Sequence, residues 1–206
     1  MTAFFANQST EKIAQELLGK KIIYQNADET ISALIVETEA YLGQKDSTAH
    51  AYRGHRSPAN EALYGPPGMI YIFSLRKQMM LNFITQKCNV PQGILIRGIE
   101  PLTGIKVMEH NRLKHGLALT NGPGKLTQAL GISDCSLNLT MLNQGPLTLE
   151  LKSGKRPRQI KASARINVSK RGTWTKKPLR FFVAENPYVS LMPKRQMDLR
   201  DHGWSE

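Results

Sequence analysis

The stretch Val36-Glu37-Thr38-Glu39-Ala40-Tyr41 decides how we interpret this chain, because it closes an apolar, β-branched run over residues 31–41 that predicts a strand. Side chains alternate between the two faces of a strand, so Glu37, Glu39 and Tyr41 share one face. Two carboxylates beside an aromatic ring are unusual on a buried face, since a buried charge needs a partner. The segment is therefore either an edge strand with a solvated acidic face or part of a site.

The rest of the chain mixes strands and helices without a regular alternation, which favours an α+β domain over a doubly wound one. Further strands are predicted at 20–24, 69–75, 93–99, 147–151, 164–168 and 179–184. Helices are predicted after Thr10 as N-cap (Ile13, Leu17 and Leu18 sharing a face and Gly19 closing it), at 104–112 and at 124–130. Residues 42–68 predict a long loop, which indicates either a missed element or a functional loop.

Length and charge narrow the class of protein. The 206 residues suit a single domain over 1–206, with residues 192–206 as a tail open to disorder. Lys and Arg outnumber Asp and Glu by 28 to 16, for a net charge of +12. Residues 152–180 contain many basic residues and no acidic residue. This favours a polyanionic partner such as nucleic acid, although a basic protein without one is the plainer alternative.

Several classes are disfavoured by the sequence. No apolar run approaches the roughly 20 residues of a membrane helix, and the N-terminus lacks a secretory pattern, so we expect a cytoplasmic protein, associated with the nucleoid if bacterial. Cys88 and Cys135 are too few for a disulfide framework. The histidine pairs at 50 and 55 and at 110 and 115 do not have the spacing of a zinc site, so no metal is expected.

Arg97 lies inside the apolar stretch Leu95–Ile99. A buried arginine is costly without an acid or an anionic ligand, so Arg97 either faces a site or pairs structurally with Glu37 or Glu100.

Seven motifs follow one another along the chain: Val36–Gly43 with Asp46 and His50, Pro67–Phe73, Leu81–Asn82, Ile94–Pro101, Asn121–Leu130, Arg165–Ile166 and Lys177–Val183. In this order and spacing they closely resemble the alkyladenine (3-methyladenine) DNA glycosylases over about residues 10–191. The resemblance implies a curved, mainly antiparallel β-sheet with surrounding helices. It also implies a monomeric, monofunctional enzyme of base-excision repair that works on double-stranded DNA without a cofactor.

The resemblance also implies roles for individual residues. Glu39 is the general base and Arg97 its companion in the water site. The residues that hold the extruded base are Tyr41, His50, Tyr71 and Phe73, with Asn82 crowding the exocyclic amino group of normal guanine. The expected substrates are 3-methyladenine and 7-methylguanine, with hypoxanthine and ethenoadenine left open because Phe73 lacks the hydroxyl often found there.

The expected chemistry fits these residue types. An N-alkylated purine already carries positive charge and leaves easily, and a single carboxylate can deprotonate water while stabilising an oxocarbenium-like sugar. Aromatic faces favour a cationic base by roughly 0.5–2 kcal/mol per contact. Extruding a damaged base also costs less than extruding a sound one.

The chain departs from the family at the residue that fills the gap left by the flipped base. Relatives commonly carry a tyrosine there, whereas this chain has Ser74–Met79 and is one residue shorter. Leu75, Arg76 and Met79 are the candidates, with Arg76 preferred because it can stack and also contact phosphate.

Further DNA contacts are expected from Arg53 and Arg56 in the long loop, from Lys125 after the Asn121–Gly124 turn, and from Lys177. That turn is also compatible with an ordinary helix start. Two rival functions remain at this stage, a catalytically silent DNA binder and an RNA- or nucleoside-processing enzyme. The combination of Glu39 with Arg97 disfavours the first, and the broad basic surface disfavours the second.

Overall fold

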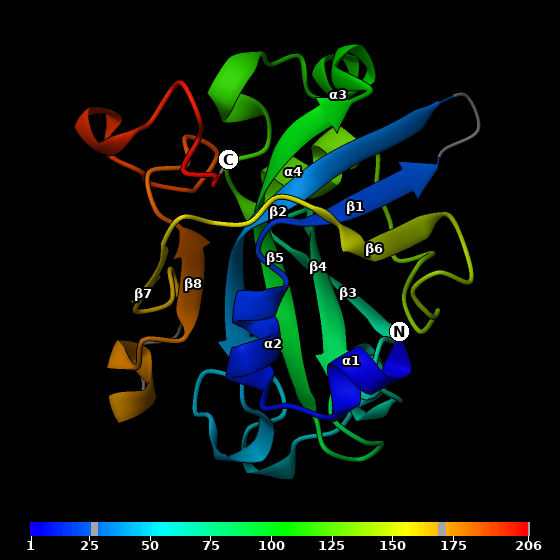
Figure 1. Cartoon of the computed structure of the whole chain (residues 1–206). Coiled ribbons are helices and arrows are strands. Elements are labelled where there is room, and N and C mark those ends of the chain that lie inside the picture. The colour runs from blue at the N-terminus through cyan, green and yellow to red at the C-terminus, as the bar shows by residue number, and fades with distance from the viewer. Residues whose placement is uncertain (26–28, 169–171, 206) are drawn as a thin grey trace.

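The computed structural model describes residues 1–25, 29–168 and 172–205, which form a mixed α+β single domain (Figure 1). An open eight-stranded antiparallel sheet runs in the order β3-β4-β5-β2-β1-β6, and β8 pairs with β2 while β7 pairs with β8. The strands are β1 (Lys20–Gln25), β2 (Thr30–Tyr41), β3 (Ile70–Leu75), β4 (Gln78–Thr85), β5 (Gln92–Thr103), β6 (Leu147–Gly154), β7 (Ile160–Ser163) and β8 (Arg180–Val183). The helices are α1 (Thr2–Ala6), α2 (Thr10–Glu16), α3 (Ile105–Arg112) and α4 (Pro123–Leu130). The predicted fold class is confirmed.

The strand β2 lies in the interior of the sheet. One of its edges pairs with β5 along most of its length, and the other pairs first with β1 and then, over Glu37–Glu39, with β8. The alternative of a solvated edge strand is therefore wrong, because Glu37 and Glu39 have no exposed surface.

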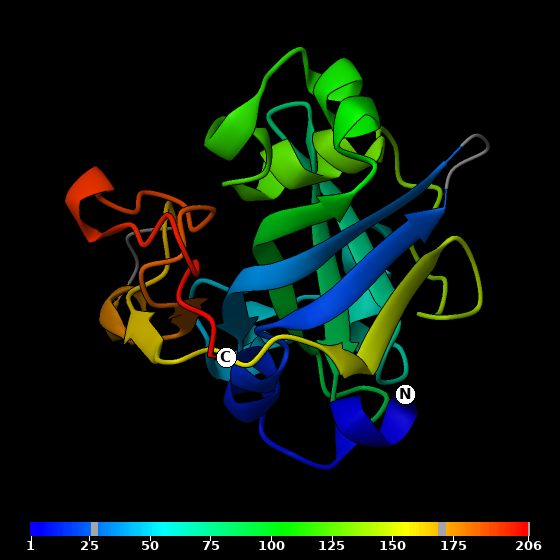
Figure 2. The same cartoon turned by 45° about the horizontal axis from the view of Figure 1, so that its top comes forward.

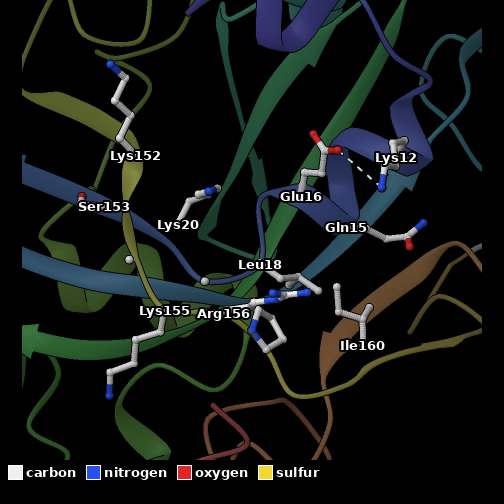
Figure 3. Close-up of a pocket in the computed structure, with 13 residues that line it drawn as sticks. Lys12, Gln15, Glu16, Leu18, Lys20, Lys152, Ser153, Lys155, Arg156 and Ile160 are labelled. Atoms are coloured by element: carbon white, nitrogen blue, oxygen red, sulfur yellow. Dashed lines mark ion pairs between the residues drawn. The ribbon is translucent and has the colours of Figure 1, made fainter. Parts of the chain in front are cut away.

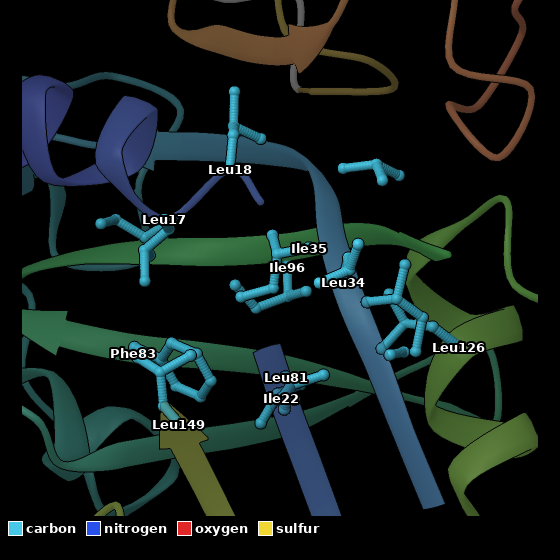
Figure 4. Packing of buried hydrophobic residues seen from close by; sticks show 14 of the residues in the cluster. Leu17, Leu18, Ile22, Leu34, Ile35, Leu81, Phe83, Ile96, Leu126 and Leu149 are labelled. Atoms are coloured by element: carbon cyan, nitrogen blue, oxygen red, sulfur yellow. The ribbon is translucent and has the colours of Figure 1, made fainter. Parts of the chain in front are cut away.

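The larger of two hydrophobic clusters among the described residues joins the two long strands to the helices around them. Figure 4 shows Leu17 of α2, Ile35 of β2, Ile96 of β5 and Phe83 of β4 packed in it, with Leu126 of α4 at one side. Figure 2 shows α3 and α4 together at one end of the sheet and β7 and β8 at its side. Burial of side chains of this size stabilises the fold by roughly 1.5–3 kcal/mol each.

The first predicted helix is present with a different cap. Ser9 is the N-cap of α2, and its hydroxyl accepts a hydrogen bond from the backbone N–H of Lys12 at 3.2 Å. Thr10, predicted as the cap, is the first helical residue and is buried, with its hydroxyl 2.7 Å from that of Thr85. A threonine that finds a tertiary partner is not free to cap, and the serine before it takes that position.

Four differences concern other elements. The sequence did not predict β4, β7 or α1. The strand predicted at 164–168 is wrong, since the strand β7 ends at Ser163. Beyond it the Arg165 side chain turns inward to Asp46, the backbone N–H of Ile166 binds Glu39, and Asn167 adopts a φ of 56°, a combination that no pleated strand allows.

Residues 42–68 contain three 3₁₀ helices, at Gly43–Lys45, Tyr52–Gly54 and Pro58–Tyr64. Asn60 anchors the segment, because its side-chain amide donates to the carbonyls of His50 and His55 at 3.2 and 3.0 Å. The predicted long loop is thus a segment with short 3₁₀ helices, and it carries His50.

Residues 192–205, part of the segment that the sequence left open as a tail, lie against the domain. Trp204 is buried and donates from Nε1 to Oε2 of Glu100 at 2.9 Å. The same carboxylate lies 3.0 Å from Nδ1 of His202 and accepts a 2.7 Å hydrogen bond from Asn186. A buried glutamate thus holds the C-terminal segment in place.

Candidate active site

One row of paired residues crosses four neighbouring strands and assembles the site. Glu39 of β2 pairs with Leu95 of β5, Leu95 with Asn82 of β4, and Asn82 with Tyr71 of β3. Residues directly opposite one another point to the same face of a sheet. Adjacent strands lie about 4.8 Å apart, so this row spans about 14 Å from Glu39 to Tyr71. The register brings together residues that lie far apart in the sequence.

This row lies on the face of the sheet opposite helix α2. Thr38, between the two glutamates, points to the helix and donates its hydroxyl to the carbonyl of Ala14 at 2.9 Å. Glu37 and Glu39 point the other way, and Arg97 lies against both. The alternation expected from the sequence therefore holds at this position, despite register shifts beside Glu37.

The carboxylate of Glu39 is fully buried and is held by three groups. Its Oε1 accepts from the backbone N–H of Ile166 at 2.7 Å and lies 3.3 Å from Nε of Arg97. Its Oε2 accepts only the hydroxyl of Tyr41, at 2.8 Å, among the described residues. A carboxylate has about four acceptor positions, so the described residues leave one position on Oε2 unused.

The pKa of Glu39 is raised above its usual value of 4.5. Burial is the largest cause, and the negative charge of Glu37 adds to it. The positive charge of Arg97 and the hydrogen bonds from Ile166 and Tyr41 act in the opposite direction without cancelling it. A glutamate with a raised pKa is a stronger base than an exposed one, provided that it is ionised at the working pH.

Glu37 is engaged as a structural anchor. Its Oε1 accepts from Nε of Arg180 at 2.6 Å, Nε of Arg97 at 3.1 Å and the hydroxyl of Ser190 at 2.7 Å. Its Oε2 accepts from the backbone N–H of Ser190 at 2.8 Å. Gly98 stands opposite it, and a Cβ there would lie 3.2 Å from the side chain of Glu37. With four donors and this close packing, Glu37 ties β2, β5 and β8 together.

Arg97 has the double role that the sequence left open. It forms the structural ion pair with Glu37 that the sequence offered as one alternative, and it also lies within ion-pair distance of Glu39. Glu100, the other proposed partner, is occupied by the C-terminal segment instead. Arg97 therefore lowers the cost of holding two carboxylates in one buried place.

Tyr41 has one face covered by a cation. The guanidinium of Arg165 lies 4.6 Å from the centre of the Tyr41 ring and pairs with both oxygens of Asp46, at 2.6 and 2.9 Å. Burial, followed by the charge of Glu39, raises the pKa of the Tyr41 hydroxyl well above its usual 10.0. The hydroxyl therefore stays protonated and remains a donor to Glu39.

His50, Tyr71 and Phe73 form an aromatic cluster at the other end of the row. Nδ1 of His50 lies 2.9 Å from the hydroxyl of Tyr71, and the His50 and Phe73 rings meet edge to face at 4.5 Å between centres. Burial, with a smaller effect of the charge on His55, lowers the pKa of His50 below 6.5. The imidazole is thus neutral at pH 7.

Asn82 lies beside this cluster, and its orientation is fixed by the backbone. Its side-chain amide donates to the carbonyls of Tyr71 at 3.1 Å and Met80 at 3.0 Å. Both amide hydrogens are used in this way, so the group offers an oxygen to the space beside it.

The candidate intercalating residues occupy the β3–β4 hairpin. Arg76 and Lys77 form its two-residue turn, with φ of 50° and 63°, between the paired Leu75 and Gln78. Positive φ at both positions is typical of a type I′ turn. Leu75 is 52% exposed and Arg76 is exposed, whereas Met79 packs partly against the core. Helix α4 supports the hairpin, because Thr127 donates its hydroxyl to the carbonyl of Met79 at 2.8 Å.

The other predicted DNA contacts differ in how far they are engaged within the protein. Arg53 is exposed and Lys177 lies over the ring of Trp174, with Nζ 3.4 Å from its centre. Lys125 donates to Oδ1 of Asn121 at 2.7 Å, and burial followed by the charge of Arg112 lowers its pKa. Arg56 is already paired, since its Nε donates to Oε2 of Glu61 at 2.9 Å.

The sequence interpretation gave no role to Arg180, Ser190, Leu95 or the pair of Arg165 with Asp46. Arg180 begins β8 and lies in the apolar stretch Leu179–Val183, so the signal that identified Arg97 could also have identified it. Ser190 and Leu95 carry no comparable signal, because only the tertiary register brings them to the glutamates.

Neither of two cavities, of about 420 and 670 Å³, is lined by Glu39. Among the residues that the structure describes, no group of three His, Cys, Asp or Glu side chains could hold a metal ion. Within the same part of the chain, every helix is too short or too polar to cross a bilayer. Cys88 and Cys135 are free and exposed.

Comparison with known proteins identifies the family of the chain. Residues 3–187 match the family model described as Methylpurine-DNA glycosylase (MPG). Proteins named "Putative 3-methyladenine DNA glycosylase" are similar over nearly the whole chain. One from Latilactobacillus sakei is 45% identical over 98% of this chain and 95% of its own length, and one from Staphylococcus saprophyticus is 46% identical over 97% and 98%. The chain belongs to the methylpurine-DNA glycosylase family and is a DNA glycosylase.

Proposed function

We propose that this protein extrudes alkylated purines from duplex DNA and hydrolyses the N-glycosidic bond with water activated by Glu39, leaving an abasic site. The observation that carries the proposal is the environment of Glu39. It is a buried carboxylate of raised pKa, balanced by Arg97, with an acceptor position left on Oε2.

The hydrolysis needs one base. As the bond to the purine lengthens, positive charge develops on the sugar, and the negative charge of Glu39 stabilises it. Glu39 accepts a proton from the attacking water, and the water oxygen bonds to the anomeric carbon. The electrons of the broken N-glycosidic bond leave with the purine. An alkylated purine already carries positive charge and leaves as a neutral molecule. This chemistry requires no lysine nucleophile, metal or redox cofactor.

Glu37 does not compete for this role, because its oxygens already accept four hydrogen bonds. Its negative charge nevertheless contributes to the raised pKa of Glu39. In the unliganded protein Glu39 has no exposed surface. We therefore expect the groups around it to part when the sugar and the water enter.

The extruded base would lie between Tyr41 and the cluster of His50, Tyr71 and Phe73, with Asn82 beside it. The face of Tyr41 opposite Arg165 and the ring of Phe73 would suit a flat, cationic base. A neutral His50, kept so by its lowered pKa, adds no repulsion toward positive charge. The preference for alkylated purines would thus arise from the charge of the lesion as well as from its weakened bond.

The DNA would be held by basic side chains around this face. Arg76, at the tip of the β3–β4 hairpin, would enter the space that the flipped base leaves. Arg53, Arg56, Lys125 and Lys177 are the proposed backbone contacts, although Arg56 would have to exchange Glu61 for phosphate.

The finer specificity follows from the same residues. We propose 3-methyladenine and 7-methylguanine as substrates, and hypoxanthine and ethenoadenine as weaker ones, because a neutral base gains less from cation–π contact. We also propose that the protein acts as a cytoplasmic monomer.

The test is base release from duplex oligonucleotides that each carry one lesion: 3-methyladenine, 7-methylguanine, hypoxanthine or ethenoadenine. We expect free alkylated base, together with strands that break only after alkali treatment. No release above background from any of the four at moderate salt would contradict the proposal. Strand cleavage without alkali would contradict the monofunctional mechanism alone.

A further inference from the structure

A cavity of about 420 Å³ lies on the face of the sheet that carries α2, away from Glu39 (Figure 3). Its lining comes from the outer side of α2, from the start of β1 and from the end of β6 with the residues that follow. Lys12, Gln15 and Glu16 contribute from α2, whose opposite side packs Ile13 and Ala14 into the core, together with the C-cap residue Leu17.

The charge of this lining is strongly positive. Five cations surround the cavity against one carboxylate: Lys12, Lys20, Lys152, Lys155 and Arg156 against Glu16. Lys12 lies 3.5 Å from Glu16 and so neutralises it. Among the described residues, the other four cations form no ion pair, whereas the neighbouring Lys21 and Arg158 pair with Glu150 and Asp198. Four unneutralised cations around one hollow repel one another unless an anion lies between them.

A close backbone crossing holds these cations in place. Gly19 and Gly154 have φ of 83° and 136°, and a Cβ on Gly19 would lie 1.9 Å from the carbonyl oxygen of Lys155. The backbone N–H of Lys155 donates to the carbonyl of Gly19 at 3.0 Å. Ser205 donates from its N–H to the carbonyl of Arg156 at 2.8 Å. Only glycine permits this crossing, which brings the backbone that carries Lys155 and Arg156 against the start of β1, where Lys20 lies.

We propose that this cavity is a second phosphodiester-binding site, which takes the backbone of a second DNA segment while the first lies on the Glu39 face. The cations continue beyond the cavity, since Lys152 and Lys155 point away from each other in Figure 3 and Lys161 is exposed on β7. A strip of this kind suits successive phosphates of a strand better than one small anion. Ser153 and Gln15 add neutral hydrogen-bond donors to the lining.

One protein molecule would then bridge two duplexes through opposite faces of its sheet. The proposal does not depend on which base the enzyme removes. It predicts DNA binding with a strong salt dependence, because each phosphate contact contributes about 0.9 to the slope of log affinity against log salt concentration.

The test compares two triple variants with the same change of charge. Lys20→Gln/Lys155→Gln/Arg156→Gln alters the cavity, and Lys87→Gln/Lys194→Gln/Arg195→Gln alters exposed cations outside its lining. Bridging is measured as energy transfer between a donor-labelled duplex with a stable abasic analogue and an acceptor-labelled undamaged duplex. Base release from a short lesion duplex is measured in parallel.

We expect wild type and the control variant to bridge the two duplexes. We expect the cavity variant to bind the second duplex at least about tenfold more weakly, with a salt slope smaller by about 2–3 and with unchanged base release. Equal losses in both variants, or no second duplex bound by wild type, would overturn the proposal. Competition by a free nucleotide at concentrations that leave the first duplex bound, without any bridging, would also overturn it.

A measurement on the unmodified protein guards against misfolding of the variant. Amide exchange over residues 12–20 and 152–157 is followed as duplex is added. We expect protection of these residues with the second equivalent of DNA and not with the first. Unchanged exchange at saturating DNA would contradict the site, and loss of base release alone would contradict only the proposed function.

Discussion

The hydroxyl of Tyr41 donates a 2.8 Å hydrogen bond to Oε2 of Glu39, the glutamate two residues before it on β2. Because of the alternation along a strand, these two side chains share a face, and their contact joins the proposed base-stacking ring to the proposed base catalyst. The hydrogen bond lowers the pKa of Glu39, although burial keeps it raised overall. Substitutions at either residue therefore have distinct, measurable effects on the pH dependence of the reaction.

Tyr41→Phe should move the acidic limb of the pH–rate profile to higher pH. The variant keeps the ring but loses the hydrogen bond that stabilises the ionised form of Glu39. The pKa of Glu39 then rises further. Since only the ionised carboxylate is a base, a higher pH is needed for full activity. The measurement is the single-turnover rate of base release between pH 5 and 9. Tyr24→Phe, on β1, is the control, and an unmoved limb in Tyr41→Phe would contradict the assignment.

Glu37→Gln should damage the fold more than the chemistry. Glu37 accepts from Arg180, Arg97 and both the backbone and the hydroxyl of Ser190. Removing its charge leaves two buried arginines with less compensation, which typically costs about 3–5 kcal/mol. The free energy of unfolding by urea measures this loss, with Glu150→Gln on the surface as the control. A loss below about 1 kcal/mol would mean that Glu37 is not the anchor we describe.

Asp46→Asn should destabilise the protein at neutral pH by about 3–5 kcal/mol, because it leaves the buried guanidinium of Arg165 without its acid. Burial alone would raise the pKa of Asp46, but the hydrogen bonds and charge of Arg165, together with Thr48, hold it below the usual 3.8. A lowered pKa contributes stability above the unfolded value and loses it as the pH falls through the folded one.

The difference in unfolding free energy between wild type and Asp46→Asn should therefore narrow as the pH falls below the usual pKa of an aspartate. Asp134→Asn provides the matched control, since Asp134 is exposed and accepts a hydrogen bond from the backbone N–H of Ser136. A difference that is constant with pH would show that packing, and not the ion pair, is responsible.

Arg76→Ala should impair base extrusion more than general DNA binding. A guanidinium that stacks in the vacated space contributes on the order of 1–2 kcal/mol, so we expect about tenfold less extruded base. The fluorescence of 2-aminopurine beside the lesion reports extrusion, and anisotropy with undamaged duplex reports general binding. Lys77→Ala is the control, because Lys77 shares the turn, the charge and a positive φ. Equal losses in both assays would make Arg76 a phosphate contact only.

Local chemistry made part of the candidate site visible in the sequence. Alternation along one strand predicts that Glu39 and Tyr41 share a face, and a charge in an apolar stretch singles out Arg97, whereas the roles expected of these residues came from the family resemblance. What could not be foreseen is the register, which sets Leu95 and Asn82 between Glu39 and Tyr71. Pairing across strands depends on tertiary packing and on the irregularities beside Glu37, and neither has a local signature.

The errors in the fold have the same origin. Residues 164–168 have the composition of a strand, but the contacts of Arg165 with Asp46 and of Ile166 with Glu39 outweigh that propensity. Ser190, which supplies two hydrogen bonds to Glu37, lies in a stretch without any pattern. The contact of Ser190 with Glu37 depends on the tertiary packing of the chain after β8 and has no signal in the local sequence.

The most direct test of the account is single-turnover release of 7-methylguanine from duplex DNA by Glu39→Gln, with binding to the same DNA measured in parallel. We predict that release falls by at least about a thousandfold, the order expected when a general base is lost together with its charge, while affinity for the damaged duplex changes little. Release by Glu39→Gln at a rate near that of wild type, or its loss in a folded Glu37→Gln but not in Glu39→Gln, would contradict the assignment of Glu39 as the base.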